Sequence, residues 1–379
     1  MSVRSVFFFC LDSEEVLQED VVCLADGLRQ LGIPFYGNCN YWQETPQDRE
    51  FLIKYDPHVA FSDCDVVVVS HVWPFSVEGH TFKATARLLP AGLFRLGRNH
   101  KIVYMDHHDG YRTISWEKEF RQFDLILRCK LNRRMSHPNN MHPWAHAITP
   151  LMLDATKNSP PFAKRNKTIL INYGASHRFV HGARTLSSKK FEPEIARVLE
   201  IDRRKDDLTL EPKSSLDALM WHQTGRRFSR SYYERLNHAQ SIACFCGEII
   251  PAAPYHGAER LLASGFRAKM WRAFFEFFDL FDPRPQRSVQ WDSFRFWEAL
   301  AAGALAFNID LDQYGVELPV MPENWKHYIG IDLTRSRQSI ERIKEEPRVM
   351  AQVAEQGRSW ALEHYTPKKV AERFLKIVG

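Results

Sequence analysis

Residues 290–310 read QWDSFRFWEALAAGALAFNID, and this stretch predicts a short helix that leads directly into a buried strand. Asp292 or Ser293 can cap the start of the helix, and the apolar residues that follow recur at helical spacing. Gly303 suits a left-handed helix end, and 304–309 is a continuous apolar run of strand length. Helices that alternate with fully apolar strands are typical of α/β folds, so the rest of the chain should repeat this pattern.

Glu298 stands out because it lies inside this short and otherwise largely apolar helix. The first N–H groups of the helix, at Ser293, Phe294 and Arg295, can receive a diphosphate, and Arg295 adds a cation. The Glu298 carboxylate can then accept hydrogen bonds from a ribose diol. A plain surface ion pair between Arg295 and Glu298 is the alternative, and spacing alone does not decide between the two.

The first part of the chain alternates apolar runs with helical stretches, which predicts a parallel sheet covered on both faces. The expected strands are 6–11, 64–70, 101–105 and 123–129, with an amphipathic helix at 16–32.

A polar stretch with paired prolines, 154–167, reads as a linker, after which the alternation begins again. Two open α/β domains, 1–155 and 168–362, are therefore expected to face a cleft, with ligands bound outside the carboxyl ends of the strands. Expected in the second part are strands at 168–175, 241–247, 304–309 and 327–333, and helices at 192–202, 336–363 and 367–378.

The composition, with 44% apolar and 26% charged residues, is that of a soluble globular protein. No run is long enough to span a bilayer, and the first residues do not form a secretory signal, so we expect a cytoplasmic protein. The seven cysteines are an odd number without framework spacing, which disfavours structural disulfides.

The net charge is mildly positive, +5 from 51 basic and 46 acidic residues. The basic clusters are interleaved with acidic residues, so a nucleic-acid partner is not expected. Small anionic ligands, or peripheral contact with the anionic inner face of a membrane, agree with the same charges.

The densest polar cluster, MDHHDGYR at 105–112, directly follows an expected strand. A carboxylate or a carboxylate-oriented histidine can take the proton of an acceptor hydroxyl. Asp109 or His108 is the candidate base, with Asp106 as its orienting partner; a turn capped by its aspartates is the alternative. A metal site shared with other histidines is not expected, because prolines interrupt their spacing. Those histidines are His137, His142 and His146.

Two further loops follow expected strands. In 172–182, Gly174 and Ser176 permit close backbone approach, and Arg178 can face a phosphate. In the first domain, His71 and Trp73 are candidates for the acceptor side, since sugars stack on aromatic faces; simple packing of that loop is the alternative.

The pattern S-F-R-x-x-E-A-L-A-A-G-x-L-x-F, which starts at Ser293, resembles the C-terminal-domain signature of GT-B glycosyltransferases. The likeness is nearest to the exostosin-like and related groups, and 232–247 is similar to the segment that precedes the signature there. The resemblance implies two Rossmann-like domains and a last helix, 363–379, that returns to the first domain.

The same resemblance implies that Glu298 binds the donor ribose and that Ser293 and Arg295 bind the diphosphate. Retaining members with paired glutamates carry the first one eight residues before the second, and that position is Gln290 here. The stereochemical outcome is therefore left open.

The function expected from the sequence is transfer of a sugar from a nucleotide-sugar to a hydroxyl acceptor, in polysaccharide or glycoconjugate synthesis, without a metal or cofactor. One alternative is another nucleotide-dependent enzyme, an epimerase or an oxidoreductase. The missing glycine fingerprint after the first strand disfavours the oxidoreductase. The other alternative is a non-catalytic binding protein that keeps the fold.

Overall fold

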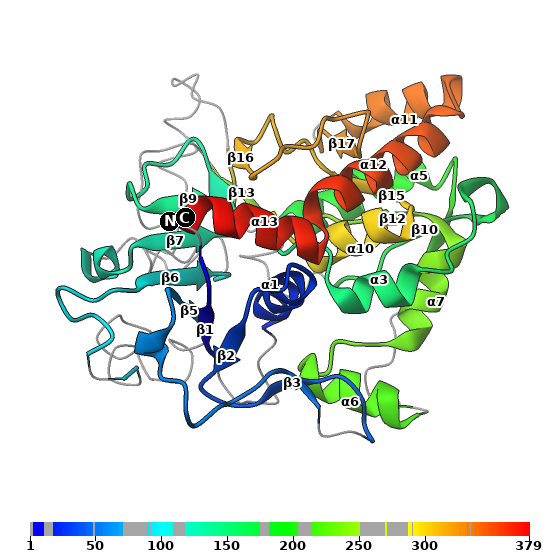
Figure 1. The fold of residues 1–379 in the computed structure, drawn as a ribbon. Coiled ribbons are helices and arrows are strands. Elements are labelled where there is room, and N and C mark those ends of the chain that lie inside the picture. Colours follow the sequence, from blue (N-terminus) through cyan, green and yellow to red (C-terminus); the bar gives the residue numbers. More distant parts are fainter. Residues whose placement is uncertain are drawn as a thin grey trace.

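Two α/β regions lie side by side in a computed structural model of the chain (Figure 1). The structure describes residues 3–10, 18–47, 50–70, 89–90, 92–108, 118–174, 182–203, 212, 214–250, 270, 287–289, 291–333 and 335–379.

The first region is built on a six-stranded sheet in which every strand pair is parallel. Its order is β2-β1-β5-β6-β7-β9. Its strands are β1 (Val6–Phe9), β2 (Phe35–Gly37), β5 (Val66–Ser70), β6 (Lys101–Asp106), β7 (Leu125–Arg128) and β9 (Met141–Pro143). The run VVVVS of β5 is buried along its whole length, as a parallel strand covered on both faces requires.

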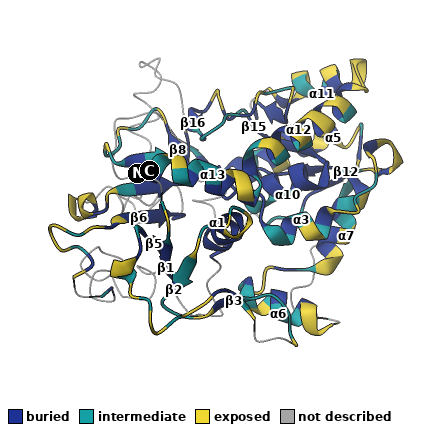
Figure 2. Cartoon of the chain, in the orientation of Figure 1, coloured by how far each residue is buried: buried dark blue, intermediate teal, exposed yellow. Residues whose placement is uncertain are grey.

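Alternate side chains of this sheet enter two different cores, because successive residues of a strand point to opposite faces. Phe7 and Phe9 join a smaller cluster on one face, and Val6 and Phe8 join the large core on the other. Figure 2 shows the strands of both regions as buried and the outer helix faces as exposed.

The second region has a five-stranded parallel sheet of order β11-β10-β12-β15-β17. Its strands are β10 (Asn166–Leu170), β11 (Glu200–Asp202), β12 (Ala239–Ala243), β15 (Leu305–Ile309) and β17 (Ile329–Ile331). Its helices are α4 (Gly182–Leu186), the π-helical turn η6 (Ser187–Phe191), α5 (Glu192–Ile195), α6 (Ser215–Gln223), α7 (Arg230–His238), α10 (Phe294–Ala302) and α11 (Ser336–Glu345).

Three two-stranded ribbons accompany the sheets, and one of them joins the two regions. In that ribbon β8 (Leu131–Asn132), from the first region, pairs with β16 (Val316–Glu317), from the second. The other ribbons are β3 (Tyr41–Gln43) with β4 (Phe51–Ile53), and β13 (Glu248–Ile250) with β14 (Arg287–Val289). The short 3-10 helices are η1 (Phe61–Asp63), η4 (Lys118–Gln122) and η5 (Phe162–Lys164).

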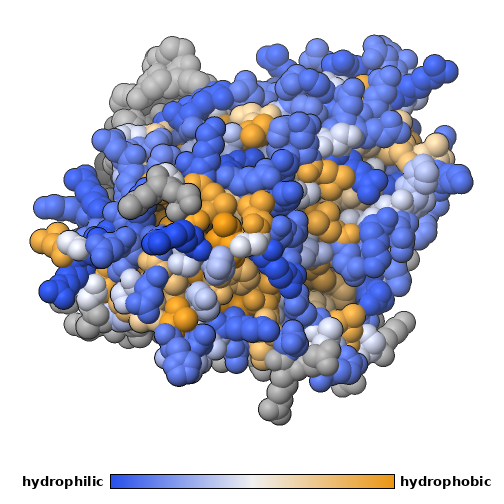
Figure 3. Space-filling model, viewed as in Figure 1, coloured by the Kyte–Doolittle hydropathy of each residue, from blue (hydrophilic) through white to orange (hydrophobic). Residues whose placement is uncertain are grey.

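The last helix crosses back to the first region. It is α13 (Pro367–Val378), which follows α12 (Val349–Tyr365) and packs on α1 (Glu19–Gln30). The helices approach so closely at Gly27 that a Cβ there would lie 2.0 Å from the Pro367 carbonyl oxygen. At the other end, Lys101 Nζ donates to the Val378 carbonyl at 2.5 Å. Apolar side chains gather in the middle of this face, over α1, α13 and α3 (Pro150–Thr156) (Figure 3).

The expected two-sheet α/β architecture is confirmed, and the differences are local. The helix expected over 192–202 ends at Ile195, and its last three residues form the edge strand β11. The helix expected over 336–363 is divided at Pro347, which cannot continue the hydrogen bonding of α11. Among the described residues, no helix combines the length and the apolar character that crossing a membrane requires.

Candidate active site

Helix α10 begins at the carboxyl edge of the second sheet, and its start carries unused polar groups. Ser293 is the extended residue before the helix, and its side chain makes no capping bond. Its hydroxyl oxygen is buried and has no hydrogen-bond partner in the described part of the chain. The first amides of any helix also lack intrahelical acceptors. A buried hydroxyl beside such amides is a site prepared for an acceptor such as a phosphate oxygen.

Asp292 fixes this helix start in place. Its carboxylate accepts the Trp297 indole N–H at 2.7 Å and the His146 backbone N–H at 3.2 Å. Burial raises the pKa of Asp292 to about 6. At the other end, Gly303 has φ 68°, the left-handed conformation expected from the sequence.

Two guanidinium groups converge beside α10. Arg295 Nε donates to the Asn172 carbonyl at 2.9 Å, at the end of β10. Arg184, from α4, is buried and donates to the carbonyls of Phe245 and Gly174, each at 3.1 Å. Both groups lie near the Tyr173 ring, Arg184 at 5.3 Å and Arg295 at 5.9 Å from its centroid.

Burial lowers the pKa of Arg184, and the neighbouring positive charge of Arg295 lowers it further. Two cations held this close together favour a shared anion. Sequence reasoning missed Arg184, because nothing in its spacing from Gly174 or Arg295 shows that α4 turns back onto β10.

Glu298 contacts α7. The hydroxyl of Tyr232 donates to Glu298 Oε2 at 2.5 Å, and that of Tyr233 donates to Oε1 at 3.2 Å. The carboxylate is half-buried, and it interacts electrostatically with Glu19 at the start of α1. Burial and then Glu298 raise the pKa of Glu19 to about 8. Glu298 thus faces the boundary between the two regions.

The candidate catalytic residues Asp106 and His108 lie inside the first region. Asp106 is fully buried and pairs with Arg128 of β7 at 2.7 Å, and it also accepts the His108 backbone N–H at 3.1 Å. His108 Nε2 lies 2.9 Å from the Tyr104 hydroxyl. These contacts describe an internal ion-pair network at the end of β6. Asp109, the third candidate, lies outside the described residues.

His107 points the opposite way, toward α1 and His146, since neighbours on an extended chain alternate in direction. His107 Nε2 lies 3.1 Å from Asp20 Oδ2, and His107 Nδ1 lies 3.0 Å from His146 Nδ1. Burial raises the pKa of Asp20 to about 7. The His146 ring packs on Phe294, with centroids 4.4 Å apart, at the first residue of α10.

His107, Cys129 and His146 could be taken for a metal site, because their ligand atoms all lie within 4.8 Å of one another. However, Cys129 Sγ lies almost equally far from the two His107 ring nitrogens, 3.4 and 3.3 Å. It therefore sits against the ring and not along the lone pair of either nitrogen. The group fits a hydrogen-bonded chain better than a coordination shell.

The remaining sequence candidates are divided by where they lie. Ser293, Phe294, Arg295 and Glu298 come together at α10, and Gly174 joins them through its bond from Arg184. Ser176, Arg178, His71 and Trp73 lie outside the described residues.

No protein-family model matches the sequence, and no curated protein matches it. Solved structures do match. An alpha-glucosyltransferase in complex with UDP-glucose and DNA containing an abasic site gives a TM-score of 0.53 at 10% identity, over 100% of both chains. The chain has the GT-B fold. An alpha-glucosyltransferase (AGT) in complex with UDP gives 0.51 at 11% identity, again over 100% of both chains.

The likeness at these identities concerns the fold alone. In the GT-B fold the carboxyl edges of the two sheets face each other. The residues at the start of α10 and those at the end of the first sheet therefore lie on opposite sides of one boundary. Here Asp292, from the second region, binds the backbone of His146, which follows the first sheet. The geometry therefore places His146 of the first region, which contacts His107, beside the start of α10 in the second region.

Proposed function

We propose that this chain is a glycosyltransferase that moves a sugar from a nucleotide-sugar to a hydroxyl acceptor, in polysaccharide or glycoconjugate synthesis. The observation that carries the proposal is the buried Ser293 hydroxyl at the start of α10, which has no hydrogen-bond partner among the described residues and lies on the same helix as the Arg295 guanidinium, with Arg184 beside it. In a GT-B fold this arrangement supports binding of a diphosphate. The signature around α10 supports kinship with the exostosin-like and related groups.

The donor would be held at both ends of its nucleotide. Arg184, Arg295 and the α10 amides would stabilise the negative charge that the diphosphate gains as it leaves. Glu298 would accept the ribose hydroxyls, since its carboxylate already accepts two hydroxyl groups from tyrosines. Ser176 and Arg178 remain proposed phosphate contacts from the sequence.

The acceptor hydroxyl must lose its proton as its oxygen bonds to the anomeric carbon and the bond from that carbon to the diphosphate breaks. We assign this proton to the group formed by Asp20, His107 and His146, in which the Asp20 carboxylate, 3.1 Å from His107 Nε2, would stabilise a protonated imidazole by its charge. Asp109, proposed from the sequence, is the competing base. Asp106 and His108 are engaged in the internal network of the first region, which favours a structural role for both.

The other expectations from the sequence stay part of the proposal. His71 and Trp73 would lie on the acceptor side, and no metal or cofactor would be required. The chain would act in the cytoplasm, with contact to the inner face of a membrane through its basic clusters. The domain boundaries 1–155, 168–362 and 363–379 are proposed on the same basis.

A thermal-shift panel of UDP, GDP, ADP and NAD(P) tests the proposal, followed by hydrolysis of the sugar conjugate of the stabilising nucleotide. UDP comes first, because two structures that share the fold were solved with UDP or UDP-glucose. We expect one nucleoside diphosphate to raise the melting temperature. Stabilisation by NAD(P) alone would favour an oxidoreductase, and binding without any hydrolysis or transfer would favour a non-catalytic protein.

A further inference from the structure

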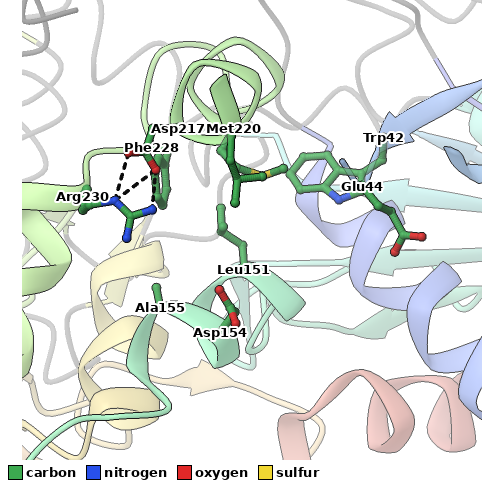
Figure 4. A pocket seen from close by; sticks show the side chains of 10 residues that line it. Trp42, Glu44, Leu151, Asp154, Ala155, Asp217, Met220, Phe228 and Arg230 are labelled. Atoms are coloured by element: carbon green, nitrogen blue, oxygen red, sulfur yellow. Dashed lines mark hydrogen bonds and ion pairs between the residues drawn. The ribbon is translucent and has the colours of Figure 1, made fainter. Parts of the chain in front are cut away.

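A cavity lies on the boundary between the two regions, outside the proposed diphosphate site. It encloses about 220 Å³. This is less than the roughly 300–1,000 Å³ of pockets for drug-sized ligands, so it accepts one ring-sized group. Its walls come from β3 and the residue after it, from α3, from α6 and from the start of α7 (Figure 4). The lining residues are Trp42, Glu44, Leu151, Asp154, Ala155, Leu216, Asp217, Met220, Phe228 and Arg230.

One wall of the cavity is aromatic and held under strain. Trp42 has φ 63°, a left-handed backbone conformation that is unusual for a bulky residue and is found preferentially at functional sites. Two bonds to α6 hold the next residue in place. The Gln43 backbone N–H donates to Gln223 Oε1 at 2.5 Å, and Gln223 Nε2 donates to the Gln43 carbonyl at 2.9 Å. The Trp42 ring consequently points toward Met220 (Figure 4).

The polar groups of the cavity are mainly acceptors. Three of the lining residues are carboxylates and one is a guanidinium. Arg230 is already engaged, because its Nε and Nη2 both donate to Asp217, at 2.5–3.1 Å.

The other two carboxylates are paired as well, Glu44 with Arg29 at 2.7 Å and Asp154 with Lys157 at 2.6 Å, and each keeps further acceptor capacity. Because the lining guanidinium is already paired, the cavity disfavours a phosphate or a carboxylate. It suits a group with an apolar face for the indole ring and hydroxyls for the carboxylates, and a neutral pyranose has both.

The cavity lies close to the donor site but does not coincide with it. Phe228 lines the cavity and packs on Tyr233, with ring centroids 5.8 Å apart, and the Tyr233 hydroxyl donates to Glu298. Two aromatic side chains thus link the cavity to the carboxylate proposed for the ribose. A nucleobase is bonded directly to the ribose, so it would bind nearer to Glu298 than this.

We propose that the cavity binds a neutral saccharide unit of the acceptor, at a distance from the hydroxyl that reacts. The proposal rests on the glycosyltransferase function and names the class of acceptor. It also gives a role to α6, which lies against β3 and covers the cavity from the second region.

Saccharide binding can be measured directly by saturation-transfer NMR and calorimetry on the full chain. The probes are the methyl glycosides of glucose, galactose and N-acetylglucosamine, with glucuronic acid, glucose 6-phosphate, UDP and a short DNA duplex for comparison. We expect at least one neutral glycoside to bind and the two anionic sugars not to bind. Absence of binding by every neutral glycoside overturns the proposal.

Trp42→Ala should weaken glycoside binding roughly tenfold, the effect of losing one stacked aromatic ring, and leave UDP binding within about twofold. Trp325→Ala is the matched control, because Trp325 is also a left-handed tryptophan, with φ 62°, outside the cavity. Ala155→Phe, which fills the cavity from α3, gives the same test if Trp42→Ala does not fold.

Each outcome is decisive. Unchanged glycoside affinity in both Trp42→Ala and Ala155→Phe overturns the proposal, as does a selective loss of UDP or DNA binding. Failure of the wild-type chain to bind or hydrolyse any nucleotide-sugar would instead reject the glycosyltransferase function, and glycoside binding would still report on the cavity by itself.

Discussion

The carboxyl edges of the two sheets are built alike and charged differently. At the second sheet the charged groups are guanidiniums, Arg184 and Arg295, fixed by backbone carbonyls. At the first sheet they are Glu19 and Asp20, whose pKa values burial raises to about 8 and about 7, beside the His107 ring. The same strand topology thus produces an edge with fixed positive charge and an edge that can take up or release protons. On the proposed function, the edge with fixed charge would bind the donor and the other edge would transfer the proton.

The strongest test of this division interrupts the group of residues proposed to take the proton. His107→Gln should lower turnover by about 10²–10⁴-fold, the usual contribution of a general base, and leave donor affinity within about twofold. Steady-state kinetics and nucleotide binding measure the two quantities. His137→Gln is the control. An unchanged rate removes the His107 chain from the reaction, and a larger loss in Asp109→Asn would give the role of base to that residue.

Removal of the donor contacts should have the opposite signature. Arg295→Ala and Glu298→Ala should each weaken binding of the nucleoside diphosphate by roughly 10–100-fold, since hydrogen bonds to charged groups contribute about 1.5–3 kcal/mol. Calorimetry measures the affinity, and the exposed Glu363→Gln is the control. If both variants bound the donor like wild type, the fixed-charge edge would not be the donor site.

The proton-exchanging edge should make stability depend on pH. The folded chain keeps a proton on Glu19 up to about pH 8, whereas the unfolded chain releases it near pH 4.5. Stability should therefore fall with rising pH between these values, by up to about 1.4 kcal/mol per pH unit. Asp20 and Asp292, with pKa values raised to about 7 and about 6, act in the same direction.

Melting temperatures at pH 5.5, 6.5, 7.5 and 8.5 measure this dependence. Glu19→Gln should reduce the slope without abolishing it, because Asp20 and Asp292 still titrate. Identical slopes in the variant and the wild type would show that Glu19 does not titrate beside Glu298.

The smallest expected effect is also the most specific. Ser293→Ala should weaken donor binding by about twofold to tenfold, as for one neutral hydrogen bond of roughly 0.5–1.5 kcal/mol. The free protein should melt at the same or a higher temperature, because the variant removes a buried hydroxyl for which the described part of the chain offers no hydrogen-bond partner. A variant that loses stability but keeps donor affinity would mean that the hydroxyl serves the fold and not the ligand.

The sequence predicted the central strands well, because their apolar runs are long and uninterrupted. It missed the edge strands β2, β9 and β11, which have three residues each, too few to show an alternation of apolar and polar residues. At the site, α10 was predicted because capping, spacing and Gly303 all agree. His107 could have been separated from Asp106 and His108 by the alternation along a strand. Arg184 and Asp20 could not, since only the tertiary fold brings them to the edges.

The close contact of α1 with α13 has a consequence for how the chain is made. Gly27 is synthesised about 340 residues before its packing partner Pro367. At roughly 5–20 residues per second, this delay lasts about 20–70 seconds. During that interval α1 has an uncovered apolar face, so nascent chains that stall before α13 should be the ones that chaperones hold and that aggregate when chaperones are scarce.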